Sequence, residues 1–138
     1  MLDEAGLEST VDWYLATVEK QTGTDISYEK SGVSFPVNGS ASIHVYRVLQ
    51  EALNNVTRHS GARQAWVRLR FTNEDLQLEV EDHGKGFSSD SPKLGIGLVA
   101  MRERAELLGG SLGFSRPPAG GTLVSLRVPK EKVEGHAE

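Results

Sequence analysis

An acid at the end of a predicted strand is the first feature of this chain that suggests chemistry. The stretch VEDHGKGF, residues 80–87, closes an alternating run whose apolar positions share one face: Leu76, Leu78 and Val80. Because successive side chains on a strand point to opposite faces, Asp82 is predicted to point inward with them. Thr122 occupies an inward position in a later alternating run, residues 122–128. Two inward polar groups at strand ends predict a pocket between the sheet and the helices. The alternative is that Asp82 bends out to solvent and caps its own turn, the commoner fate of an Asp before Gly.

Two pairs of glycines flank this predicted pocket. Gly84 and Gly86 follow the acid, and residues without a Cβ let backbone approach a flat ligand closely. Gly95 and Gly97, in LGIGL, directly precede a predicted helix, whose free backbone N–H groups can bind an anion. A flexible loop is the alternative for such a pair. The polar loop between the pairs, FSSDSPK, residues 87–93, is predicted to close over a bound ligand.

A polar stripe on a predicted helix supplies the remaining candidates. Glu51, Asn55 and Arg58 fall on one side of the helix, away from its apolar face. Mg²⁺ often takes only one or two protein oxygen ligands when phosphates complete its shell, so the amide oxygen of Asn55 can suffice. A carboxylate one turn away can align or deprotonate an attacking group. The alternative is a solvated face with a hydrogen bond between Glu51 and Asn55.

Periodicity predicts the elements that position these residues. Helical spacing predicts a first helix from Leu7 to about Gly23, a second from Ser40 or Ser42 to about Ser60, and a third around residues 98–108. Alternation predicts strands at residues 65–71, 76–82, 111–115 and 122–128, with a small edge hairpin at residues 25–35. The sequence therefore predicts an α+β fold, a two-layer sandwich with three helices on one face of a mixed, mainly antiparallel sheet. One domain is expected over residues 1–129, followed by a disordered tail, residues 130–138.

Composition excludes several classes of function. The chain has 138 residues and a formal net charge of -4, with its basic residues scattered, so a nucleic-acid partner is not expected. It has no cysteine, which excludes disulfides and thiolate sites and suits a cytoplasmic location. No apolar run is long enough to span a bilayer, so no direct membrane contact is expected. No G-x-x-x-x-G-K-[ST] motif occurs, which excludes a P-loop.

Four motifs resemble those of a known superfamily. QEALNNVTRH is similar to the N box, EDHGKGF to the D-x-G-x-G box, LGIGL to the second glycine box and GGTLVSLRVP to the closing strand of the GHKL, or Bergerat-fold, ATPases. The four motifs have the order and spacing of that superfamily from about Leu7 to Pro129. YRVLQEALNNVTRHSGA and GLVAMRERAELLGGSL most resemble the catalytic domain of sensor histidine kinases of the nitrate-sensor type.

The resemblance implies that ATP and Mg²⁺ bind here. Asp82 would accept a hydrogen bond from the adenine amino group with help from Thr122, and Gly84 and Gly86 would let the base lie against backbone. His83 departs from the Asn or Asp that is more usual there, and its side chain is expected to point away from the base.

The phosphate end of the site follows from the same resemblance. Asn55 would coordinate Mg²⁺ and Glu51 would be the catalytic group near the γ-phosphate. Residues 87–94 would form a lid over the nucleotide. The remaining residues implied to bind the nucleotide are Arg58, His59, Gly95, Ile96, Gly97 and Leu98.

The expected function is transfer of the γ-phosphate of Mg-ATP to a histidine on a separate dimerisation domain, with a response regulator as an indirect partner. The isolated domain is expected to be a monomer. Two alternatives are a GHKL serine kinase acting as an anti-sigma factor and a nucleotide-binding module without transfer activity.

Overall fold

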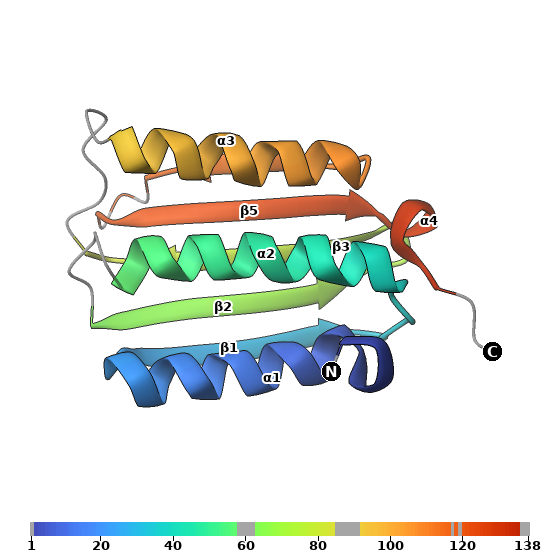
Figure 1. Cartoon of the computed structure of the whole chain (residues 1–138), viewed down its shortest axis with the longest axis horizontal. Helices are drawn as coiled ribbons and strands as arrows, with labels where there is room; N and C mark the ends of the chain where they lie inside the picture. Colours follow the sequence, from blue (N-terminus) through green and yellow to red (C-terminus); the bar gives the residue numbers. More distant parts are fainter. Residues whose placement is uncertain (1, 58–62, 85–91, 117, 119, 136–138) are drawn as a thin grey trace.

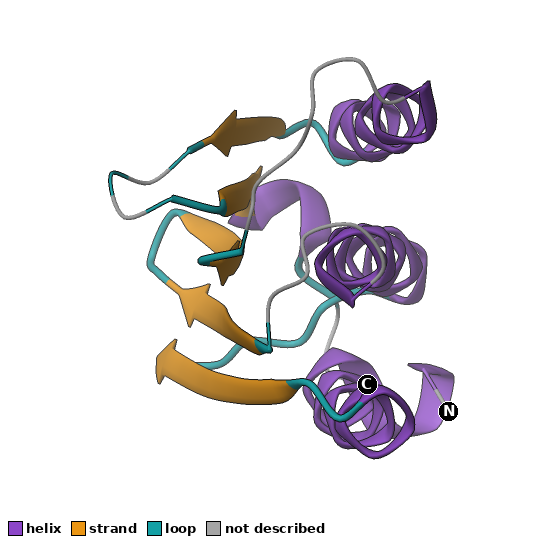
Figure 2. Cartoon of the chain, turned by 90° about the vertical axis from the view of Figure 1, so that its left-hand side faces the viewer, coloured by secondary structure: helices purple, strands orange, loops and turns teal. Residues whose placement is uncertain are grey.

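The chain folds as two layers, with three long helices on one face of a single sheet (Figures 1 and 2). The computed structural model describes residues 2–57, 63–84, 92–116, 118 and 120–135. The helices are α1 (Leu2–Thr22), α2 (Gly39–Asn55), α3 (Pro92–Leu107) and the short α4 (Lys130–Val133). The strands are β1 (Asp25–Gly32), β2 (Gln64–Phe71), β3 (Asp75–Asp82), β4 (Ser111–Ser115) and β5 (Thr122–Pro129).

The sheet is mixed, in the order β1-β2-β3-β5-β4. Strand β1 runs parallel to β2, and the other three pairs are antiparallel. The predicted α+β sandwich is therefore confirmed. The hairpin predicted for residues 25–35 is wrong, because β1 pairs with β2 along its whole length, from Asp25 opposite Gln64 to Gly32 opposite Phe71. Helix α2 provides the crossover that a parallel pair requires.

The core lies between the layers and follows the predicted periodicity. The inward positions of β2 and β3 are buried, as are those of α2 and of the residue that follows it: Val45, Leu49, Ala52, Leu53 and Val56. A strand alternation of period two and a helical period of 3.6 each place one apolar face toward the other layer. No described helix has the length and apolar character that crossing a membrane requires.

The three long helices all begin earlier than predicted, α1 at Leu2 rather than Leu7. Asn38, rather than Ser40 or Ser42, caps α2, and its side-chain oxygen accepts a hydrogen bond from Ala41 N at 2.8 Å. Helix α3 begins at Pro92. Proline is favoured in the first turn because the backbone N–H that it lacks would have no intrahelical acceptor there. Gly95 and Gly97 therefore lie inside α3 rather than before it.

The prediction of a disordered tail is wrong for residues 130–135. Lys130–Val133 forms α4, and the Val133 side chain is fully buried. Asn38 N donates to Val133 O at 2.8 Å, and Gly135 N donates to Pro36 O at 2.7 Å. Lys130 N also donates to Glu74 O at 2.8 Å, and Lys130 forms an ion pair with Glu134 at 3.6 Å. The buried Val133 side chain and these contacts hold the segment, although its sequence has no repeating pattern. Residues 136–138 lie outside the described residues.

Candidate functional site

Four element ends that carry the predicted site residues lie at one end of the molecule. They are the carboxyl ends of α2 and β3 and the amino ends of α3 and β5, at the left of Figure 1. The antiparallel pairing of β3 with β5 places Asp82 directly opposite Thr122. Residues more than 20 positions apart in sequence are thus gathered at one edge of the sandwich.

Asp82 points into the protein, as predicted. Its side chain is fully buried, and Thr122 is 2% exposed. Thr122 Oγ1 donates to Asp82 Oδ2 at 2.5 Å, and Gly84 N donates to Asp82 Oδ1 at 2.8 Å. The carboxylate accepts a hydrogen bond within its own turn, but the alternative that it bends out to solvent is wrong, because it is fully buried. Each carboxylate oxygen keeps further capacity to accept a hydrogen bond from a ligand.

Gly121 is a residue of this region that the motif reading did not single out. It has φ +87°, and a Cβ atom added there would lie 1.9 Å from the Asp82 backbone oxygen. The close approach brings β5 alongside the end of β3 and so allows Thr122 to reach Asp82. The only signal in the sequence is the Gly-Gly pair directly before the inward threonine.

Substitution of Gly121 is expected to be costly. Gly121→Ala should lower the free energy of unfolding by about 2 kcal/mol or more, because the residue needs a positive φ and the clash is with backbone that cannot rotate away. Chemical denaturation measures the loss. Gly120→Ala is the matched control, since Gly120 has φ +95° but an added Cβ would meet nothing closer than 3.9 Å. Equal losses in the two variants would contradict a role for the close contact.

Asn55 on α2 is buried rather than solvated. It is 4% exposed, and its Nδ2 atom has no hydrogen-bond partner among the described residues. A buried amide without a partner is uncommon in a folded protein, since desolvation of the group costs about 1–3 kcal/mol. The alternative of a solvated stripe with a bond from Asn55 Nδ2 to Glu51 is therefore wrong for Asn55. The Nδ2 N–H groups are therefore available to an acceptor atom of a ligand.

Glu51 lies one turn earlier on α2 and is only partly buried. Its carboxylate packs against Gly97 of α3, because a Cβ added to Gly97 would lie 2.4 Å from Glu51 Oε1. Beside it is a hollow of about 260 Å³ between the two helices, lined by Arg47, Gln50, Glu51, Asn54, Ala100, Met101 and Arg104. Glu51 thus borders this hollow between α2 and α3.

Gly97 does not lie at a free helix terminus in the way the sequence suggested, whereas Gly95 lies in the first turn of α3. Gly97 is the sixth residue of α3, beyond the first four N–H groups that lack an intrahelical acceptor. Leu98 packs against the core. The Ile96 side chain, Arg58, His59, Gly86 and most of the predicted lid, residues 87–91, lie outside the described residues.

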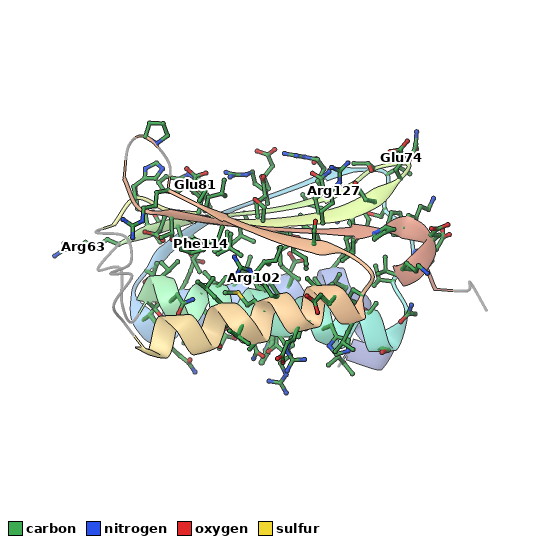
Figure 3. The ribbon with its side chains drawn as sticks, turned by 90° about the horizontal axis from the view of Figure 1, so that it is seen from above. Arg63, Glu74, Glu81, Arg102, Phe114 and Arg127 are labelled. Carbon is green, nitrogen blue, oxygen red and sulfur yellow. The ribbon has the colours of Figure 1, made fainter. Side chains whose placement is uncertain are left out.

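His83 turns to the outer face of the sheet, as expected. Its ring stacks on Trp66 with a centroid separation of 4.5 Å, and its Nε2 lies 2.8 Å from Glu81 Oε2. Glu81 also accepts a hydrogen bond from Arg68, and these two contacts hold the pKa of Glu81 below its usual value despite partial burial. Figure 3 shows Glu81 and Arg127 on this face, opposite the helices. His83 is therefore held away from the Asp82 side.

Fold and site together define an α+β sandwich with a polar site at one end of the interior strands β3 and β5. The site is built from a buried carboxylate, a hydroxyl, an amide and a second carboxylate. The family model of the histidine kinase-, DNA gyrase B- and HSP90-like ATPases matches residues 40–132, and the chain belongs to that family. The GHKL resemblance of the four motifs is confirmed by this match.

Among curated relatives, the chain is similar to two histidine kinases. It is 32% identical over 129 residues to the signal transduction histidine-protein kinase/phosphatase DegS of Brevibacillus brevis, covering 93% of the chain and 33% of the relative. It is 35% identical over 130 residues to the oxygen sensor histidine kinase NreB of Staphylococcus carnosus, covering 93% of the chain and 38% of the relative. The chain thus spans about a third of the length of these relatives.

Solved structures confirm the fold. The histidine kinase domain of a blue-light activated histidine kinase from Erythrobacter litoralis matches with a TM-score of 0.71 at 22% identity, over 91% of this chain and 63% of that one. The ATP-binding domain of PrrB from Mycobacterium tuberculosis matches with a TM-score of 0.64 at 18% identity, over 83% of this chain and 86% of that one.

Proposed function

We propose that this domain binds Mg-ATP and transfers its γ-phosphoryl group to a histidine on a separate helical dimerisation domain. The observation that carries the proposal is the buried Asp82–Thr122 pair, at the same end of the fold as Asn55 and Glu51. The relatives that are named histidine kinases support the choice of reaction.

The buried pair would select adenine. Asp82 offers a carboxylate with free acceptor capacity in a site that excludes water, and the adenine amino group is a donor of matching polarity. Guanine presents a carbonyl oxygen at the corresponding position, which a buried carboxylate repels. The bond from Thr122 fixes the carboxylate orientation before the base arrives.

Asn55 would hold Mg²⁺ through its amide oxygen. The unpartnered atom is the donor Nδ2, which would bind a phosphate oxygen beside the ion while Oδ1 faces the ion. Among the described residues no group of three or more His, Asp or Glu side chains could hold a metal, which suits an ion whose other ligands are phosphate oxygens and water. When bound, the ion would neutralise phosphate charge.

Glu51 would act on the incoming imidazole. In the transfer step the bond between the γ-phosphorus and the β,γ-bridging oxygen breaks and ADP leaves. The unprotonated imidazole nitrogen forms the new bond to phosphorus through its lone pair, and Glu51 accepts the proton that the other ring nitrogen then loses. The half-open position of Glu51 beside the hollow between α2 and α3 leaves room for that imidazole to approach.

Transfer to an added domain tests the proposal. We expect labelled Mg-ATP to leave an acid-labile phosphate on a histidine-bearing helical dimerisation domain mixed with this chain, and none on the chain itself. His44 contacts Arg104 through Nδ1 at 3.1 Å and His83 is stacked on Trp66, so neither is free to approach a γ-phosphate in line. The full-length oxygen sensor histidine kinase of Staphylococcus carnosus, with its own ATP site inactivated, is a suitable source of the acceptor.

Two outcomes would contradict the proposal. Acid-stable label on a serine of an added protein would favour the serine kinase alternative. ATP binding without label on any acceptor domain, in conditions where a related kinase labels the same domain, would favour a nucleotide-binding module.

A further inference from the structure

Gly97 is the point of closest approach between α3 and the Glu51 side chain. The three nearest atoms to a Cβ built on Gly97 all belong to Glu51: Oε1 at 2.4 Å, Cδ at 3.3 Å and Cγ at 3.5 Å. Gly97 is itself buried. The carboxylate of Glu51 therefore rests in a slot on α3 that exists only because residue 97 has no side chain.

Backbone conformation does not explain this glycine. Gly97 lies inside α3 and is not among the glycines with a positive φ, so an alanine fits the local backbone there. In a helix interior, alanine is intrinsically more stable than glycine. The absence of a side chain at residue 97 therefore makes room for a neighbouring group, and that group is the Glu51 carboxylate.

We propose that Gly97 is a positioning residue, which fixes where the Glu51 carboxylate lies and so sets the geometry of proton acceptance from the attacking imidazole. The inference rests on the proposed function and differs from a role in holding phosphate. The atom that an added methyl group would displace is the end of a flexible side chain, not backbone. A methyl group there is accommodated by moving Glu51 Oε1 by about 1 Å, with the fold unchanged.

Gly97→Ala tests the proposal. We expect kcat for transfer to the helical acceptor domain to fall about 10 to 100-fold, because a shift of about 1 Å in a catalytic group has effects of that size. The Kd for Mg-ATP should change by less than about 2-fold, because the shift alters an interaction made in the transition state and not the binding of ATP in the ground state. The Tm should stay the same or rise. Gly113→Ala on β4 is the control, because a Cβ there would meet nothing closer than 3.8 Å, and transfer should be unchanged.

A double-mutant cycle shows whether Gly97 acts through Glu51. In the Glu51→Asp background the shorter side chain no longer fills the slot, so Gly97→Ala should lower kcat by less than about 2-fold further. A crystal structure of the Gly97→Ala variant should show the Glu51 carboxylate displaced while α2 and α3 keep their spacing.

These measurements separate failure of the inference from failure of the proposed function. Absence of transfer by the unaltered chain would overturn the proposed function, whereas the crystal structure would still test the placement of Glu51. A lowered Tm, a Glu51 carboxylate that has not moved, or additive losses in the cycle would overturn the positioning role.

Discussion

Glu51→Gln is expected to lower the rate of phosphoryl transfer by about 100-fold or more, because a positioned general base contributes about 10² to 10⁴-fold. Glutamine has the shape of glutamate and still fills the slot at Gly97, but it cannot accept the imidazole proton. Because the change lies away from Asp82 and Thr122, ATP affinity should change little. Single-turnover transfer to the helical acceptor domain, paired with calorimetric ATP titration, measures both quantities.

Glu103→Gln is the matched control for that variant. Glu103 is an exposed glutamate on α3, so it loses the same charge without touching the site. Equal transfer rates in this control and the unaltered chain are expected. A Glu51→Gln variant that transfers at the unaltered rate would show that Glu51 is not the base. Asn55 would then be the remaining residue of α2 proposed to act in transfer.

Asp82→Asn is expected to weaken ATP binding by about 10 to 150-fold while the domain stays folded. A hydrogen bond to a charged group contributes about 1.5–3 kcal/mol, which corresponds to that range of affinity. Asparagine keeps the size of the side chain and one oxygen acceptor for Gly84 N, so the turn after β3 is retained. The variant should also discriminate less between ATP and GTP, because the charge that repels the guanine oxygen is gone. Calorimetry with both nucleotides measures the change.

Asp75→Asn is the control for that variant, on the same strand. Asp75 lies at the opposite end of β3, is 5% exposed and forms an ion pair with Arg127. Burial raises the pKa of Asp75, but hydrogen bonds from Thr72, Arg127 and Gln77 outweigh it and lower the pKa overall. Its substitution should reduce stability and leave ATP affinity unchanged. If Asp82→Asn binds both nucleotides as the unaltered chain does, the adenine pocket is not at Asp82.

Much of the site was predictable because strand parity and helix periodicity are local. The parity of Leu76, Leu78 and Val80 placed Asp82 inward, and the structure buries it completely. The same reasoning placed Thr122 inward, although it could not show that the two side chains share a hydrogen bond. That bond depends on the pairing of β3 with β5, whose residues here lie 40 positions apart.

The errors arose where distant segments decide the structure. Strand β1 extends along β2 because a parallel neighbour is available, which no alternation within residues 25–35 reveals. The tail at Lys130–Val133 is held by Asn38 and by burial of Val133, contacts made 95 residues away in the chain. The start of α3 at Pro92 moved both glycines into the helix and changed what Gly97 can do.

The sequence by itself determined the family, the two-layer architecture and the buried faces of the helices and strands. Each of these follows from residue types that recur at short, regular spacing. Only the tertiary structure decided that Gly121 lies against the Asp82 backbone and that Gly97 lies against the Glu51 carboxylate. A glycine carries no side chain to indicate its neighbour, so its function appears only when the segment that occupies the empty space is brought there by folding.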